Sequence, residues 1–264
     1  MRIDYHVHTD NSMDCKAPMA TMCEAAVAIG IQELAFTDHL NSHTLDMDLG
    51  YYNADHYFED IERCRAMFPD LTIRAGVEVG EPHRFWKRVQ PILDSYPYDL
   101  VLGSVHWVGN ESVFDANYYR ARQPQDAFAA YFSEMARMVE HGGFDIAAHI
   151  DVVKRTSFGV YGAFDTHQFQ DMLCAVWSAC LKANITPEIN TRSLRLPCAE
   201  LHPATDALRW YAEMGGKRLT FGSDAHQPES VGGGMIAARD SALAAGLKHV
   251  SLFEGRKIIR WAAL

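Results

Sequence analysis

The sequence predicts an α/β fold, a single-domain barrel of about seven parallel strands surrounded by helices. Strand-like and helix-like segments alternate along the chain, which is the pattern of parallel strands joined by helices. Six strand-like apolar runs end in a histidine, an aspartate or a glutamate, and such ends meet on one face of a barrel. The length of 264 residues suits one barrel, and no linker, repeat or low-complexity segment divides the chain. We therefore treat residues 1–264 as one domain.

The expected strands are short runs rich in aliphatic and β-branched residues. They lie at Ile3–His8, Glu33–Thr37, Thr72–Val79, Asp99–His106, Phe144–His149, Ile185–Asn190 and Leu219–Gly222. Seven runs fit a seven-stranded barrel better than one of eight. A shorter strand at His249–Leu252 and a terminal helix complete the expected chain.

Prolines open several of the expected helices and glycines end them, as at Pro82 and Gly30. The helices lie at Met19–Ile29, Asp55–Met67, Pro82–Asp94, Gln125–His141, Thr166–Ala183, Pro203–Met214 and Met235–Ala245. In the second of them, the apolar residues Phe58, Ile61 and Met67 are expected to share a face.

The composition narrows the function classes. The chain has 24 Lys and Arg against 34 Asp and Glu, so its net charge of −10 offers no basic footprint for broad nucleic-acid binding. A small phosphorylated substrate stays compatible, because bound divalent cations make a site positive whatever the overall charge.

No apolar stretch approaches a membrane span and no cleavable signal precedes the first strand, so we expect a cytoplasmic protein. The six cysteines lack short spacings and are expected to be reduced, with Cys15 beside a proposed ligand.

The strand ends carry a set of metal-type ligands. His6 and His8 alternate along one strand, so both side chains point to the same face. Six histidines and three carboxylates fall at strand ends or just after them: His6, His8, Asp14, His39, Glu78, His106, His149, Asp224 and His226. Nine ligands are too many for one tetrahedral ion and suit two or three ions, with Glu78 as a bridge. Mixed imidazole and carboxylate ligands favour zinc, iron or manganese, and metal-assisted hydrolysis is the first hypothesis.

Five segments make the chain similar to the PHP (polymerase and histidinol phosphatase) superfamily. They are Asp4–Thr9 (DYHVHT) followed by Asp14, Phe36–His39 (FTDH), Gly76–Gly80 (GVEVG), Tyr98–His106 (YDLVLGSVH) and Gly222–His226 (GSDAH). Phe144–Asp151 and Pro187–Thr191 resemble the branch of monofunctional histidinol-phosphate phosphatases in particular. The resemblance covers most of the chain.

This resemblance implies a distorted (β/α)7 TIM-like barrel with a trinuclear metal centre. Carried over by position, the ligands fall into three sets, which are His6, His8, Glu78 and Asp224; Glu78, His106 and His149; and Asp14, His39 and His226. Many relatives have histidine where this chain has Asp14. An oxygen ligand at that position favours iron or manganese over zinc, so the metal identity stays open among the three.

The resemblance also implies a phosphoric monoester hydrolase that converts L-histidinol phosphate to L-histidinol and phosphate in histidine biosynthesis. Two close ions clamp a phosphate and lower the pKa of a bridging water, so a metal-bridging hydroxide attacks. The expected catalytic residues are Glu78, Asp224 and His226. The cations expected to bind the substrate lie just beyond strand ends and are Lys154, Arg155, Arg192 and Arg195. No leaving-group acid is evident. Further candidates for substrate contact are Glu81, Asp115, Asp151, His43 and His202.

Three other functions stay open at this stage. A PHP nuclease acting on oligonucleotides needs the same metals and a basic, aromatic groove, and the charge of −10 counts against it. An amidohydrolase-like enzyme also begins with His-x-His on a barrel strand, but no lysine stands at a strand end to bridge its metals. A non-catalytic metal-binding module would keep the ligands without turnover. The favoured partner is a small phosphate ester, with no nucleic acid and no membrane, and the oligomeric state is open.

Overall fold

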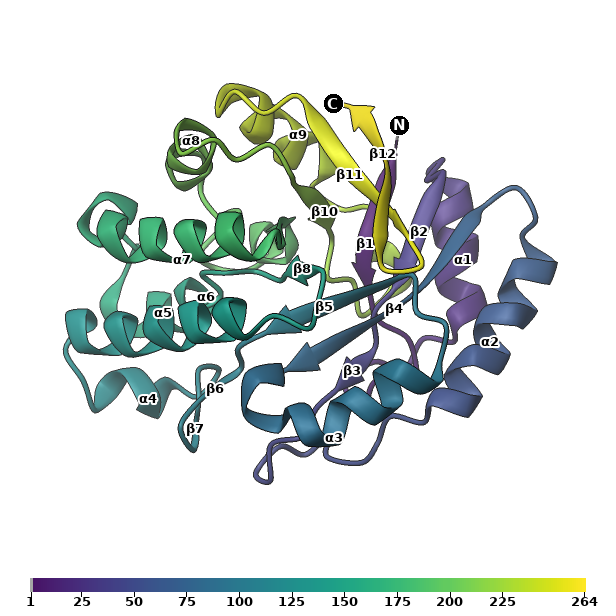
Figure 1. Cartoon of the computed structure of the whole chain (residues 1–264), viewed down its shortest axis with the longest axis horizontal. Coiled ribbons are helices and arrows are strands. Elements are labelled where there is room, and N and C mark those ends of the chain that lie inside the picture. The colour runs from purple at the N-terminus through teal and green to yellow at the C-terminus, as the bar shows by residue number, and fades with distance from the viewer. Residues whose placement is uncertain (1) are drawn as a thin grey trace.

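A parallel sheet curved into a nearly closed barrel forms the centre of the computed structural model, which describes residues 2–264 (Figure 1). Its strand order is β1-β2-β4-β5-β8-β9-β10, and the short β3 also pairs with β4. These strands are β1 Ile3–Val7, β2 Glu33–Phe36, β3 His39–Leu40, β4 Thr72–Gly80, β5 Leu100–Ser104, β8 Ile146–Ala147, β9 Thr186–Asn190 and β10 Thr220–Gly222. The barrel closes where the amide of His8 donates to the carbonyl of Ala225 at 2.9 Å. The expected seven-stranded α/β barrel is confirmed.

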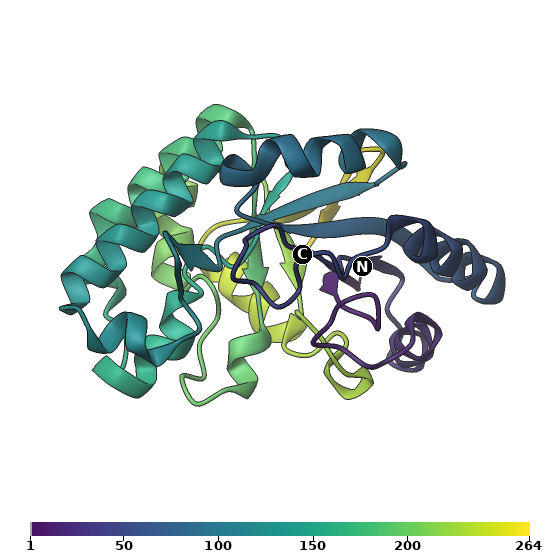
Figure 2. The same cartoon turned by 90° about the horizontal axis from the view of Figure 1, so that it is seen from below.

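Helices cover the outside of the strands, as the view from below shows (Figure 2). They are α1 Met19–Ala28, α2 Ala54–Met67, α3 Pro82–Ser95, α4 Ala116–Arg120, α5 Pro124–His141, α6 Val153–Tyr161, α7 Gln170–Ala183, α8 Thr205–Glu213 and α9 Met235–Ala244. Short 3₁₀ turns lie at η1 Thr166–Phe169, η2 Arg192–Arg195 and η3 Pro228–Ser230. Strands β1 and β5 are buried at every position, because a parallel sheet is covered on both faces. Within residues 2–264, no helix is long and apolar enough to cross a membrane.

The expected terminal helix is wrong. Strand β11 (His249–Glu254) pairs antiparallel with β12 (Lys257–Ala263), so the chain ends in a hairpin. Gly255 and Arg256 have φ values of 54° and 66°, the positive values that a two-residue hairpin turn requires. A second small hairpin, β6 (Trp107–Val108) with β7 (Glu111–Ser112), lies between the expected strand Asp99–His106 and the expected helix Gln125–His141.

The predicted apolar face of the second helix is partly wrong. Ile61 is buried, but Met67 is 53% exposed because it is the last residue of α2. The buried face instead includes Tyr57, Ile61 and Cys64, which follow one another at helical spacing. The tyrosine also hydrogen-bonds the sheet, since its hydroxyl donates to the carbonyl of Phe36 at 2.9 Å.

Gly222 at the end of β10 lies too close to its neighbours to accept a side chain. A Cβ atom there would lie 2.0 Å from Glu188 Oε1 and 2.4 Å from the Cβ of His6. We expect Gly222→Ala to lower the free energy of unfolding in urea by about 1–3 kcal/mol, because overpacking forces these strands apart. The matched control is Gly159→Ala in α6, where nothing lies within 4 Å of the new Cβ, and it should be neutral or stabilising. Equal stability of the two variants would contradict this packing of β10.

Candidate metal centre

Glu78, near the end of β4, is the centre of the site and is 1% exposed. Its Oε1 lies 3.0 Å from His149 Nε2 and 3.3 Å from His106 Nε2. Its Oε2 lies 3.1 Å from His6 Nε2, 3.1 Å from His39 Nδ1 and 3.5 Å from His8 Nε2. The two oxygens of one carboxylate therefore face different sets of imidazoles.

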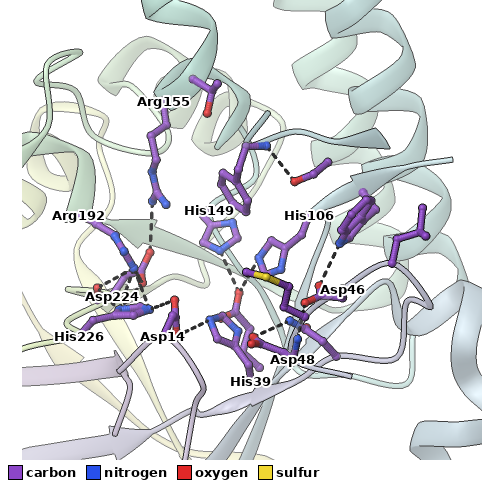
Figure 3. A pocket seen from close by; sticks show the side chains of 18 of the residues that line it. Asp14, His39, Asp46, Asp48, His106, His149, Arg155, Arg192, Asp224 and His226 are labelled. Atoms are coloured by element: carbon purple, nitrogen blue, oxygen red, sulfur yellow. Dashed lines mark hydrogen bonds and ion pairs between the residues drawn. The ribbon is translucent and has the colours of Figure 1, made fainter. Parts of the chain in front are cut away.

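Two further carboxylates complete the expected set. Asp224 Oδ1 lies 3.6 Å from His8 Nε2 and 3.5 Å from His226 Nδ1. Asp14, which is more exposed, has its Oδ2 2.9 Å from His226 Nε2 and its Oδ1 3.7 Å from His39 Nε2. The structure thus brings together all nine side chains that the sequence selected as ligands. Figure 3 labels those of Asp14, His39, His106, His149, Asp224 and His226 around one pocket, which Glu78 also lines.

The charges at the site favour an ionised Glu78. Burial alone would raise its pKa, but the neighbouring His6 and His39 outweigh burial and hold the pKa well below its usual range. Burial also opposes charging of His6, yet Glu188, Glu78 and Asp224 raise the pKa of that imidazole. The pKa of His8 moves the other way, because burial and the other imidazoles disfavour its proton.

The donor set fits divalent transition metals. Five groups of three side chains have ligand atoms within 4.8 Å of one another, including His6 with His8 and Glu78, and His39 with Glu78 and His106. Two buried nitrogens that face Glu78, His8 Nε2 and His39 Nδ1, have no well-oriented hydrogen-bond partner among residues 2–264. Buried polar atoms are rarely left unpaired, so these nitrogens suit coordination. A mixed nitrogen and oxygen set matches zinc, iron or manganese.

The sequence did not point to the buried residues that hydrogen-bond the candidate ligands and fix their orientation. Glu188 in β9 accepts a hydrogen bond from His6 Nδ1 at 2.7 Å, and its other oxygen accepts from the amide of His149 at 2.7 Å. Asp38 accepts from Ser12 Oγ at 2.7 Å, and that hydroxyl accepts from the amide of His39 at 3.0 Å. The one available signal for Glu188 was a carboxylate in the middle of an apolar strand, where only a buried partner makes it tolerable.

Two of the four expected substrate-binding cations line the pocket. Arg192 donates to Asp224 Oδ1 at 2.8 Å, and Arg155 donates to Asp224 Oδ2 at 3.3 Å. The other two have different partners. Arg195 donates to the carbonyl of Ser223 at 2.7 Å, and Lys154 lies in a buried ion pair, so neither lines the cavity.

The cavity has a volume of about 640 Å³. Its wall opposite the arginines combines aspartates with apolar side chains, which the sequence did not reveal. Asp46 and Asp48 lie opposite Arg155 and Arg192 (Figure 3). The indole of Trp107 holds this loop, since its Nε1 donates to Asp46 Oδ2 at 3.0 Å. Apolar side chains complete the rim and are Leu45, Met47, Phe114 and Leu196.

The other candidates for substrate contact do not line this cavity. His43 is buried and stacks on Trp107 with ring centres 4.3 Å apart. His202 and Asp151 are buried against each other, with 3.0 Å between Nδ1 and Oδ1. The two remaining acidic candidates accept hydrogen bonds from backbone amides instead. Glu81 accepts from the amides of His106 and Trp107, and Asp115 accepts from the amide of Asn117.

Glu188→Gln tests whether the carboxylate behind His6 supports metal binding. We expect metal affinity to fall by about 10–100-fold, because a partner that orients a ligating imidazole affects affinity to that extent. The measurement is competition with a chelator, with circular dichroism to check the fold. Glu33→Gln is the matched control, because Glu33 is also buried in a strand but pairs with Arg74 at 2.9 Å. Equal metal affinity of both variants would remove Glu188 from the site.

Comparison with known proteins agrees with this geometry. The PHP domain model matches residues 4–192. The histidinol-phosphatase of Lactococcus lactis is 29% identical over 97% of this chain and 96% of that protein, and a probable histidinol-phosphatase of Clostridium acetobutylicum is 27% identical over 99% and 100%. The crystal structure of the histidinol phosphate phosphatase from Lactococcus lactis, complexed with zinc, L-histidinol and phosphate, superposes with a TM-score of 0.87 at 27% identity, over 98% of this chain and 99% of that one. The chain belongs to the PHP domain family.

Proposed function

We propose that this protein hydrolyses L-histidinol phosphate to L-histidinol and phosphate with the help of three divalent transition-metal ions. The observation that carries the proposal is the position of Glu78, whose two oxygens face separate groups of histidines beside two arginines. The likeness to a phosphatase solved with zinc, L-histidinol and phosphate, which extends over 98% of this chain, supports the substrate.

The ligands divide among the ions by their contacts. Glu78 Oε1 with His106 and His149 would hold one ion. Glu78 Oε2 with His6, His8 and Asp224 would hold the second. Asp14, His39 and His226 would hold the third. When bound, such ions supply Lewis acidity at the phosphate and a nucleophile derived from water at neutral pH.

The arginines bind and orient the phosphoryl group. Phosphoryl transfer depends mainly on positioning and on charge stabilisation around the equatorial oxygens. Arg155 and Arg192 each donate one hydrogen bond to the carboxylate of Asp224, and each guanidinium has further N–H groups that can donate to phosphate oxygens. Asp224 therefore has two roles, as a metal ligand and as the anchor of both guanidinium groups. The neighbouring His226 contacts the same Arg192 nitrogen at 2.8 Å.

The opposite wall suits a cationic leaving group. L-histidinol carries an ammonium and an imidazole, and Asp46 and Asp48 offer carboxylates in the cavity wall opposite the arginines. Phe114 and Leu196 provide apolar surface for a ring. The same acidic loop would repel the phosphates of an oligonucleotide, so we favour the small phosphomonoester over a nuclease substrate.

Asp14 affects the choice of metal. It is 49% exposed, so it is the accessible corner of the site, and its oxygens replace an imidazole. We propose that this corner accepts iron or manganese more readily than a third histidine would, with zinc as the alternative at the buried positions.

A substrate panel tests the proposed function. The protein loaded with zinc, manganese or iron should release phosphate from L-histidinol phosphate much faster than it shortens a single-stranded oligonucleotide. It should also prefer this substrate to glycerol phosphate, whose leaving group is uncharged, because the acidic wall attracts a cation. Metal removal by a chelator is the control and should abolish all release. Faster cleavage of the oligonucleotide would refute the phosphatase, and equal rates on the two monoesters would refute the role of Asp46 and Asp48.

A further inference from the structure

A buried charge network lies next to the phosphate side of the cavity. Lys154, in the first turn of α6, is only 1% exposed. Its ammonium lies 2.9 Å from Asp151 Oδ2 and 3.1 Å from Glu200 Oε2, and it donates to the carbonyl of Leu201 at 2.8 Å. These three partners enclose the ammonium, and Lys154 does not line the cavity.

The network joins the two chain segments that carry the arginines. One segment is α6, where Arg155 follows Lys154 directly. The other segment follows β9 and carries Arg192. The backbone of His202 pairs with the end of β9: the His202 amide donates to the carbonyl of Asn190 at 3.0 Å, and the Asn190 amide donates to the carbonyl of His202 at 2.7 Å. Asn190 Oδ1 in turn accepts the amide of Arg192 at 3.1 Å. A continuous series of contacts thus runs from Lys154 to both arginines.

His202 closes the series as a neutral group. Its Nδ1 lies 3.0 Å from Asp151 Oδ1, the carboxylate that also pairs with Lys154. Burial lowers the pKa of His202 to about 4, so the imidazole is uncharged at neutral pH. Lys154 is therefore the cation that stabilises the fully buried charge of Asp151.

The two arginines meet at the other end of these segments. Arg155 Nε donates to Ser193 Oγ at 3.3 Å, and its terminal nitrogen donates to Asp224 Oδ2. Arg192 reaches Asp224 Oδ1. Each guanidinium contacts a different oxygen of one carboxylate, so a small shift of either segment changes the space between them.

We propose that Lys154 is a positioning residue that sets the spacing of Arg155 and Arg192 for the phosphate of the substrate. An apolar side chain would fill the same volume at a lower desolvation cost, but it would not connect α6 to the carbonyl of Leu201 and to Glu200 by directed contacts. The proposal rests on the proposed function, because it assumes that the two arginines bind a phosphate.

The test compares Lys154→Met with Lys154→Gln in the metal-loaded protein. Affinity for inorganic phosphate is measured by calorimetry, together with kcat, KM and metal content. We expect Lys154→Met to weaken phosphate binding about tenfold and to lower kcat/KM by up to about 100-fold, since misplaced binding groups have effects of this size, with metal content unchanged. Lys154→Gln keeps a donor for the carbonyl of Leu201 and should recover part of the loss.

A matched control separates positioning from general loss of stability. Glu134→Gln breaks another buried ion pair, with His83 at 2.8 Å, whose residues do not line the cavity. Phosphate affinity of Lys154→Met equal to that of the wild type would overturn the proposal, and so would an equal loss in Glu134→Gln.

A milder variant covers the case in which Lys154→Met does not fold. Glu200 is 27% exposed, and Glu200→Gln removes one partner of the ammonium at little risk to the fold. It should weaken phosphate binding by about two- to fivefold, because one of several anchoring contacts is lost. Unchanged affinity in this variant would also count against Lys154. A wild-type protein that binds phosphate but does not hydrolyse L-histidinol phosphate would refute the proposed function instead, and leave the comparison of phosphate affinities valid.

Discussion

One carboxylate, that of Glu78, is buried among five imidazoles, and the arrangement of the whole site follows from this contact. Glu78 has almost no contact with solvent, and a charge in such a place is costly unless it is paired. Its partners come from four other parts of the chain, at the ends of β1 and β5, in β3 and beyond β8. The curvature of the sheet from β1 to β8 brings these ends together, so the electrostatics of the site depend on the topology of the sheet.

Two residues of the site have a strained backbone, and a second layer of carboxylates holds it in place. His149 and Asp224 have φ values of 24° and 51°, in a region that costs energy for any residue with a side chain. Buried carboxylates hold the backbone around them. Glu188 accepts a hydrogen bond from the amide of His149, and Asp4 accepts hydrogen bonds from the amides of Ser223 and Gly232, both at 2.8 Å. These contacts hold the backbone at His149 and next to Asp224 in place despite its strained conformation.

The barrel and the convergence of the nine candidate ligands could be predicted because both depend on local patterns. An apolar run that ends in His or Glu predicts both a strand and the barrel face on which its last residue lies. This local pattern was enough to place Glu78 and His106. Residues whose role depends on distant partners could not be assigned in this way. Lys154 follows a strand end as Arg155 does, and only the fold reveals that its neighbours are Asp151 and Glu200. Likewise, nothing local distinguishes the loop with Asp46 and Asp48 from an ordinary polar loop, and the terminal segment with its apolar residues Ile258 and Ile259 could form a helix as well as a strand.

The most direct test of the central claim is the metal content and turnover of Glu78→Gln. Glutamine keeps the size and shape of the side chain but removes the charge that two ions would share. We expect about three equivalents of transition metal in the wild type and fewer in the variant. Turnover should fall by several orders of magnitude, on the order of 5 kcal/mol in barrier, while circular dichroism barely changes. Near-normal turnover of Glu78→Gln with a full complement of metal would show that Glu78 is not the bridge between the ions.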